Sequence, residues 1–329
     1  MTLERVLKDL GTGFLSLERG FVFGPQGQLL RRNIEELWYR HCVVQPPYNV
    51  FLSAPDRISE TLGTLWRAGA LQKPFGVAVL EEARTSWNGS VLPEGCRVPS
   101  HSLGRVTVVT EATGAKDLYH RKQRERKVWW RKFSREPKRF QFTEARRISK
   151  SKEVIEVQAQ FAFGGVVLET ICYQQDAKRI FKERNEIEKF LGNVHTVEHT
   201  ASLDWACLAF LCDAYTPADA TTPCQLKLHP KFTPYKVGFQ IHPPDDPDSK
   251  SQEKSRLLLY LNNLVKAEGI ETVVTTSECG LTALQVPLVV VVDDTTLQNG
   301  LIRVWSQLTT LHETIHITHL TKYVSARCR

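Results

Sequence analysis

The pattern of apolar residues changes at residues 216–224 (TPADATTPC), and this change constrains the fold more than any other feature of the sequence. The segment contains two prolines and no large apolar side chain, which is typical of a linker. Beyond it, strand-like runs at 235–241, 272–275, 288–292 and 300–304 flank a helix-like stretch at 251–268. This alternation predicts a compact α/β domain of about 100 residues. We therefore expect two domains, residues 1–220 and 221–329, with a loop at 242–248 and a helix at 311–324 in the second.

The first part of the chain mixes both kinds of segment. Apolar spacing predicts helices at 3–19, 29–39, 56–70, 117–135 and 205–215, and strands at 43–44, 75–80, 105–110 and 154–161. Loops are expected at 20–27 and 84–104, and the Gly164–Gly165 turn is expected to lead into a helix. The longest apolar run, Trp205–Cys212, has eight residues, against about 18 for a membrane span. We therefore expect no membrane partner.

Most of the excess positive charge lies in one segment. The net charge is +7, but residues 116–150 alone carry 14 Lys/Arg and 4 Asp/Glu. Such a concentration predicts a polyanion or an acidic partner. The candidates for contact with a polyanion are Arg121, Lys122, Arg124, Arg126, Lys127, Arg131 and Lys132. On a helix, Arg124, Lys127 and Arg131 share one face. The alternative is a solvated amphipathic helix, and for Trp129 and Trp130 we favour a place in its core.

No motif predicts catalysis, a metal site or a cofactor. The sequence has no GxxxxGKS/T, GxGxxG, GxSxG or HExxH pattern. His312, His316 and His319 are interpreted as an exposed helix face rather than a zinc site, and Asp293–Asp294 as a turn signal rather than a carboxylate pair. The eight cysteines form no CxxC pair, which favours reduced and mostly buried thiols. Residues 1–20 resemble neither a secretory signal nor a transit peptide, so a presequence is absent or cryptic.

Four stretches resemble class II aminoacyl-tRNA synthetases of the glycyl/prolyl type. They are residues 18–38 (ERGFVFGPQGQLLRRNIEELW, motif 1), 73–78 (KPFGVA, before motif 2), 161–170 (FAFGGVVLET, late catalytic domain) and 227–237 (KLHPKFTPYKV, opening of the anticodon-binding domain). The resemblance implies an α/β (α+β) fold. A degenerate synthetase-like antiparallel-sheet domain would be followed by an anticodon-binding-like α/β domain with a mixed sheet.

The chain departs from these synthetases where ATP is bound. Arg84 lies one position away from the place of the motif 2 arginine, and no glutamate follows it. Trp205 stands where motif 3 has its arginine. Without these guanidinium groups, nothing neutralises the triphosphate. An active synthetase is therefore disfavoured, and a tRNA- or RNA-binding synthetase paralogue remains an alternative.

A narrower resemblance is to the family of accessory (processivity) subunits of mitochondrial DNA polymerase gamma. It is carried by residues 17–25 (LERGFVFGP), 128–133 (VWWRKF), 295–303 (TTLQNGLIR) and 316–320 (HITHL). It implies a non-catalytic protein of the mitochondrial matrix and nucleoid. Such a protein binds the catalytic subunit of the polymerase and primer-template or double-stranded DNA, and it raises processivity in mitochondrial DNA replication.

The resemblance also implies where the polymerase binds and how the protein assembles. The second domain is the implied docking surface, with Lys231, Phe232, Tyr235, Lys236, Asn299, Leu301, Arg303 and Trp305 as candidates. Some family members form a homodimer through a helical insertion. Only about 30 residues separate Val44 from Pro74 in this chain, too few for a helical bundle. We therefore expect a 1:1 heterodimer with the catalytic subunit and no homodimer.

Overall fold

The computed structural model describes residues 2–85, 87–175, 193–218, 224–241, 251–275, 281, 284–306, 309 and 311–328. Two compact units make up the chain: Met1–Gly24 with Ile34–Ala214, and Pro25–Asn33 with Tyr215–Arg329. The expected boundary at 220/221 and the predicted loop at 242–248 lie outside the described residues.

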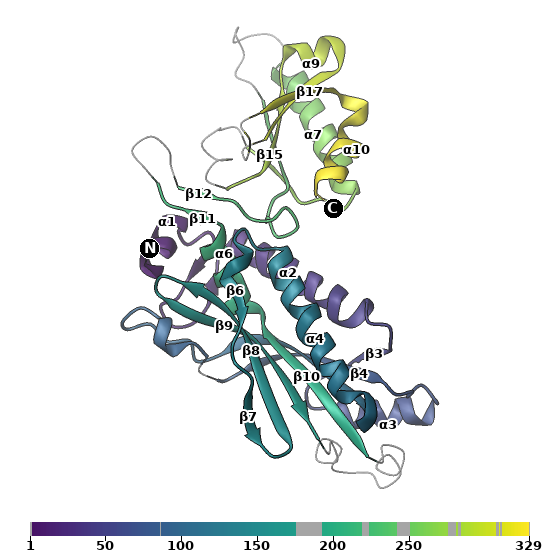
Figure 1. Ribbon diagram of the computed structural model, residues 1–329. Coiled ribbons are helices and arrows are strands. Elements are labelled where there is room, and N and C mark those ends of the chain that lie inside the picture. Colours follow the sequence, from purple (N-terminus) through teal and green to yellow (C-terminus); the bar gives the residue numbers. More distant parts are fainter. Residues whose placement is uncertain are drawn as a thin grey trace. The chain divides into compact units, whose positions relative to one another are not determined.

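An antiparallel sheet forms the centre of the first unit (Figure 1). Within the described residues it has eight strands, in the order β3 (Val50–Leu52), β4 (Phe75–Ala83), β5 (His101–Glu111), β10 (Val194–Ser202), β9 (Gly164–Gln174), β8 (Lys152–Phe161) and β6 (Phe140–Phe142), while β7 (Arg146–Ser149) also pairs with β8. All pairs are antiparallel except β3 with β4. The predicted antiparallel sheet is therefore confirmed.

Among the described helices, α3 (Ile58–Arg67), α4 (Ala112–Lys132) and α6 (Leu203–Ala214) pack on this sheet. α4 lies against β9 and β10, and α6 lies against β5 and β9. Every residue of α6 is buried, which explains why its sequence contains the longest apolar run. α3 packs through Leu62 against Val77 and Val109 of the sheet.

Several predicted elements of the first unit differ in the structure. α1 (Leu3–Leu10) stops well before residue 19, because Gly11 takes a φ of 70° and ends the helix. Short strands β1 (Leu15–Ser16) and β2 (Val22–Phe23) follow it. The predicted strand at 43–44 is wrong: α2 (Pro25–Tyr39) continues directly into a π-helical turn, Arg40–Val44.

The predicted helix after Gly164–Gly165 is also wrong. Residues Gly164–Gln174 form β9, which pairs antiparallel with β8 and β10. The β-branched residues Val166, Val167 and Ile171 favour this strand. Gly164, at a φ of 130°, makes the tight turn between β8 and β9.

The second unit has a mixed sheet, as expected. Its described strands lie in the order β14 (Thr272–Val274), β13 (Val237–Ile241), β15 (Leu288–Val292), β16 (Leu301–Ser306) and β17 (His312–His316). β13 is parallel to β14 and β15, and the remaining pairs are antiparallel. α7 (Ser251–Ala267) and α10 (Leu320–Cys328) share one apolar core with this sheet, and α9 (Asp294–Asn299) precedes β16. β11 (Tyr215–Thr216) pairs separately with β12 (Gln225–Leu226).

The helix predicted at 311–324 is only partly present. Residues 312–316 form the edge strand β17, because their backbone pairs with β16. A 3-10 turn (Ile317–His319) then leads into α10. Local spacing cannot reveal this pairing, since the hydrogen bonds come from another strand.

Gly104 shows how closely the first unit is packed. A Cβ atom added at this residue of β5 would lie 2.5 Å from Cε2 of Trp38, which is fully buried. A glycine is therefore required here by the approach of the indole ring.

We expect Gly104→Ala to destabilise the first unit by about 1–3 kcal/mol, the usual range for overpacking a core. Gly114→Ala is the matched control, because Gly114 lies in α4 with no atom within 4 Å of an added Cβ. The control should be neutral or slightly stabilising. Urea denaturation measures both, and equal stability of the two variants would contradict the packing argument.

Candidate functional site

The basic segment forms α4, and its two sides differ sharply. The buried side comprises Ala115, Leu118, Tyr119, Lys122, Arg126, Trp129 and Trp130. This is the spacing of one face of a helix. The interpretation of Trp129 and Trp130 as core residues is confirmed, since they are 4% and 1% exposed.

Arg126 is held in a buried polar cluster. Its Nε donates to both carboxylate oxygens of Glu169 on β9, at 2.7 and 2.9 Å. Trp130 Nε1 donates to the same carboxylate at 2.6 Å, and His199 Nδ1 on β10 lies 3.2 Å from it. Arg126 Nη1 also lies 3.3 Å from Sγ of Cys42. A single carboxylate therefore joins α4 to two strands.

The cluster shifts the pKa values of its members. Burial opposes the charged form of Glu169, but Arg126 and His199 outweigh it and lower its pKa to about 2. Burial lowers the pKa of His199, so the ring is neutral and its Nδ1–H donates to Glu169. Burial raises the pKa of the Cys42 thiol to about 12 in spite of the nearby Arg126. Cys42 is therefore an unreactive thiol.

Two of the seven candidates for contact with a polyanion are not available to DNA. Arg126 is 1% exposed and its guanidinium faces Glu169. Lys122 is 5% exposed, and its Nζ lies 2.7 Å from Glu125 and over the ring of Tyr48. Including both was wrong, because a run of basic residues does not reveal which side of the helix packs on the sheet.

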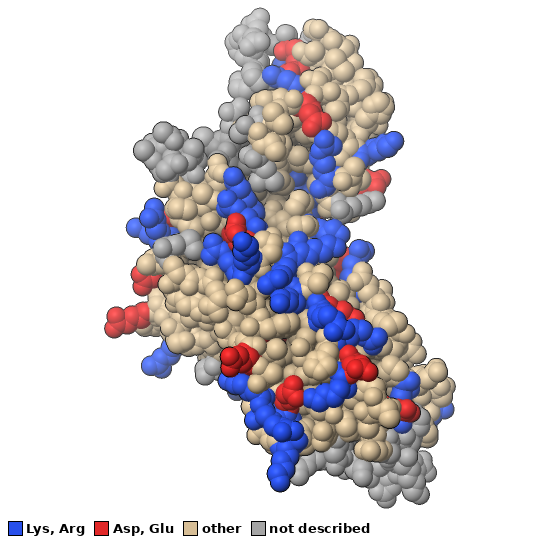
Figure 2. All heavy atoms as spheres, viewed as in Figure 1, with Lys and Arg blue, Asp and Glu red and all other residues tan. Residues whose placement is uncertain are grey.

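The other five candidates remain at the surface to different degrees. Arg121, Arg124 and Lys132 are exposed. Lys127 and Arg131 are half-buried: Lys127 Nζ lies 5.5 Å from the ring of Phe142, and Arg131 Nε donates to the carbonyl of Phe140 at 3.0 Å. Figure 2 shows Lys and Arg mixed with acidic side chains over the region of α4. The predicted face of Arg124, Lys127 and Arg131 is therefore partly open to solvent.

The docking candidates of the second unit come from two segments. From the first segment, Phe232 is fully buried, and Lys236 is 6% exposed with Nζ donating to the carbonyls of Lys231 and Thr233. Phe232 and Lys236 therefore support the fold, and treating them as surface contacts was wrong. Lys231 is half-buried. Tyr235 is half-buried in the same apolar cluster as Trp305 of β16.

The remaining candidates lie on or beside β16. Asn299 is exposed at the end of α9, and Leu301 is half-buried. Arg303 is exposed and pairs with Asp293 at 3.0 Å. Trp305 stacks on the ring of His312 with centroids 5.8 Å apart.

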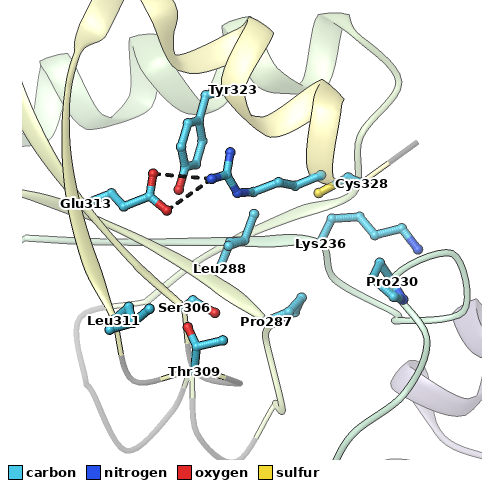
Figure 3. Close-up of a pocket in the computed structure, with 11 residues that line it drawn as sticks. Pro230, Lys236, Pro287, Leu288, Ser306, Thr309, Leu311, Glu313, Tyr323 and Cys328 are labelled. Carbon is cyan, nitrogen blue, oxygen red and sulfur yellow. Dashed lines mark hydrogen bonds and ion pairs between the residues drawn. The ribbon is translucent and has the colours of Figure 1, made fainter. Parts of the chain in front are cut away.

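The second unit has a hollow of about 370 Å³ that is lined by Lys236, the only one of these candidates to do so, and by Ser306 at the end of β16 (Figure 3). Figure 3 shows Pro230 and Lys236 on one side and Ser306, Thr309 and Leu311 on another, with Glu313 and Tyr323 above them. Arg327 lies over the Tyr323 ring at 3.7 Å and pairs with Glu313 at 3.0 Å. We name this feature the β16 hollow.

Sequence reasoning did not identify most of the β16 hollow. Leu311 is 64% exposed, and Glu313 and Arg327 are also exposed. An exposed leucine between Thr309 and His312 is a weak local signal. Glu313 and Arg327 become neighbours only because β17 pairs with β16 and α10 folds back toward it.

The histidine and aspartate patterns do not form sites. His312 and His316 lie on β17 and His319 in a 3-10 turn, so the predicted exposed helix face is wrong. Asp293 caps α9 by accepting from Thr296 N at 2.9 Å, in line with a turn signal. No group of three metal-ligating side chains was found among the described residues.

Most of the cysteines in the described residues are buried. Cys42, Cys207, Cys212 and Cys328 are buried, and Cys96, Cys172 and Cys224 are half-buried. Cys279 lies outside the described residues. A search of the described helices finds none with the length and hydropathy that a membrane span requires.

Comparison with known proteins gives two informative relatives. No profile of a known family matches the chain. The chain is 25% identical over 287 residues to "DNA polymerase subunit gamma-2, mitochondrial" of Xenopus laevis, covering 77% of this chain and 60% of the relative. It is 23% identical over 227 residues to "DNA polymerase subunit gamma-2" of Mus musculus, covering 61% and 48%. The chain thus spans about half the length of these curated relatives. The name of the Xenopus protein supports the mitochondrial location that the resemblance implied.

We expect Arg126→Met to destabilise the first unit by about 3–5 kcal/mol, because it leaves the Glu169 carboxylate buried without its cation. Lys132→Met is the control, since Lys132 is exposed at the end of the same helix. Denaturant unfolding measures both variants. Equal denaturation midpoints for Arg126→Met and Lys132→Met would show that the ion pair does not stabilise the first unit.

The same cluster predicts a loss of stability in acid. His199 has a lowered pKa when folded, so its contribution is complete above pH 6.5 and declines as the pH falls below that value. Glu169 adds a second loss below pH 4.5, its ordinary pKa. Thermal unfolding of His199→Asn should show a weaker pH dependence between 6.5 and 4.5. Some dependence remains, because burial lowers the pKa of His41 to about 4. The exposed His120→Asn should behave as wild type, and a wild-type pH profile for His199→Asn would contradict the assignment.

Proposed function

We propose that this protein is a non-catalytic accessory subunit of a mitochondrial DNA polymerase. It binds the catalytic subunit, contacts primer-template or double-stranded DNA, and raises processivity at the nucleoid. The observation that carries the proposal is the alignment of 287 residues with a subunit of that polymerase. The names of both relatives, the basic outer side of α4 and the missing motif 2 and motif 3 arginines all favour the same function.

The physical mechanism is linkage between two binding events. A subunit that holds both the catalytic subunit and DNA makes the second contact intramolecular, which slows dissociation of DNA. More nucleotides are then added in each binding event. This mechanism needs a protein surface and a DNA surface, and it needs no reactive group.

We place the protein surface at the β16 hollow. The hollow has an apolar floor that includes Leu288 and Pro287, and an exposed leucine, Leu311, at its rim. Such a concave apolar surface with a few polar groups suits an apolar anchor from a partner. Of the sequence candidates, only Lys236 lines the hollow. Tyr235 and Trp305 belong to the apolar cluster of Val289 and Val291, on the other face of the sheet.

We further propose that the first unit descends from a class II synthetase scaffold and that the assembly is a 1:1 heterodimer. Between Val44 and Phe75, the described chain contains only β3, α3 and connecting loops. It leaves no space there for the helical insertion that builds a homodimer. Light scattering should give the mass of a single chain, 37.5 kDa; twice that mass would overturn the stoichiometry.

The direct test is reconstitution with the catalytic subunit. Gel filtration of the mixture should yield a complex, and primer extension under single-encounter conditions should give longer products with the accessory chain present. An RNA-binding paralogue would instead prefer tRNA to duplex DNA in competition and leave extension unchanged. ATP–pyrophosphate exchange would reveal an active synthetase.

We expect Leu311→Asp to weaken capture of the catalytic subunit by tenfold or more, because a charge at the rim must be desolvated on docking. Leu259→Asp is the matched control: Leu259 is a similarly exposed leucine on α7 of the same unit, away from the residues that line the hollow. Titration with the catalytic subunit measures both. Equal affinities for the two variants would exclude the β16 hollow as the docking surface.

A further inference from the structure

The edge of the first sheet carries a second group of cations. β6 and β7 pair one after the other with β8, on the side of β8 away from β9. Residues 144–150 are all exposed. Within residues 145–152 there are four basic and no acidic side chains: Arg146, Arg147, Lys150 and Lys152. Figure 2 shows basic side chains gathered where Figure 1 places β7.

Three of these cations, Arg147, Lys150 and Lys152, have no carboxylate partner within the part of the chain that the structure describes. Arg146 pairs with Glu156. Arg147 lies opposite Glu153 in the strand register, but the Glu153 carboxylate is 2.5 Å from Lys116 of α4. Lys150 lies in the turn after β7. Arg147 and Lys150 are therefore positive charges without an internal structural role.

The edge continues the basic side of α4. Lys127 lies over Phe142 of β6, and Arg131 donates to the carbonyl of Phe140. Arg147 projects to the α4 side of the sheet, because its partner Glu153 contacts Lys116 on α4. Arg124, Lys127 and Arg147 thus belong to one side of the unit, and Lys150 lies in the turn that follows β7. We name this set the edge cations.

The length of the edge suits a polyanion with regular charge spacing. The register runs from Ala159 opposite Phe140 to Lys152 opposite Ser149. At about 3.3 Å per residue this is about 23 Å, equivalent to roughly seven base pairs of duplex at 3.4 Å each. Because a duplex backbone winds around its axis and the β7–β8 register shifts between Arg147 and Ser149, the edge meets phosphates at separate points along that length.

We propose that the edge cations bind the phosphate backbone of duplex DNA, with Arg147 and Lys150 extending the contact beyond α4. This inference rests on the proposed function for the choice of DNA as the polyanion. Phosphate contacts of this kind fix position and affinity without reading sequence. They also make binding depend on salt, with a slope of about 0.9 per phosphate.

The test compares two double variants and one single variant with the wild-type chain. Arg147→Ser with Lys150→Ser removes two of the unpaired edge charges. Ile148→Ser changes the exposed residue between them without changing charge. Arg57→Ser with Lys266→Ser removes the same charge from exposed positions outside the basic segment. Affinity for a short DNA duplex is measured across about 50 to 200 mM salt.

We expect the Arg147/Lys150 variant to bind duplex about tenfold more weakly, with the salt slope reduced by about two units. The Arg57/Lys266 variant should match wild type in both, and Ile148→Ser should keep the wild-type slope. Tighter binding of a duplex RNA of equal length would overturn the choice of DNA. An alternative role for basic residues at a sheet edge is to prevent aggregation through that edge. If the Arg147/Lys150 variant bound duplex as wild type does but had a larger mass in solution, that role would be established and the proposal overturned.

Capture of the catalytic subunit by the same variants separates this inference from the proposed function. Unchanged capture with weakened DNA binding supports both. A wild-type chain that binds duplex through the edge cations but fails to capture the polymerase would overturn the proposed function and leave the DNA surface intact.

Discussion

The carboxylate of Glu169 is the interaction on which the first unit depends. It is fully buried and accepts hydrogen bonds from Arg126 and Trp130 of α4 and from His199 of β10. Burying a charge is costly unless it is paired and hydrogen-bonded. This cluster therefore favours one rotation of α4 on the sheet, with the Arg126 side inward. Which cations of α4 face solvent follows from that rotation.

This rotation divides the basic segment into two roles. Arg126 and Lys122 form ion pairs within the unit, with Glu169 and Glu125 respectively. Arg124 and Lys132 remain exposed. The excess charge of the segment is thus smaller at the surface than in the sequence. It continues, however, onto β6 and β7, which lie beside the same helix along the edge of the sheet. In the second unit, the candidate surface is the β16 hollow, which has an apolar floor and lies between β16, β17 and α10.

The sequence located some strands of each sheet and missed others, among them β10 at the centre of the first sheet. Alternating residues located β5 and β8, the strand-like runs at 235–241 and 288–292 located β13 and β15, and the apolar run at 205–212 located α6. It failed at β9 and β17, since these strands are stabilised by partners distant in the chain. It also failed at 43–44, where α2 extends into a π-helical turn. The failures at β9 and β17 share a cause: strand pairing is decided by backbone hydrogen bonds that local spacing does not encode.

By itself, the sequence determined the mixed α/β class, the buried tryptophans of α4 and the location of the excess charge. It also contained the departures from synthetase motifs at Arg84 and Trp205. Only the tertiary structure decided that Arg126 pairs with Glu169, that Phe232 and Lys236 are internal, and that Leu311 lines a hollow. Helical periodicity fixes which residues share a side of a helix. Which side is buried depends on the partner that the rest of the fold brings to it.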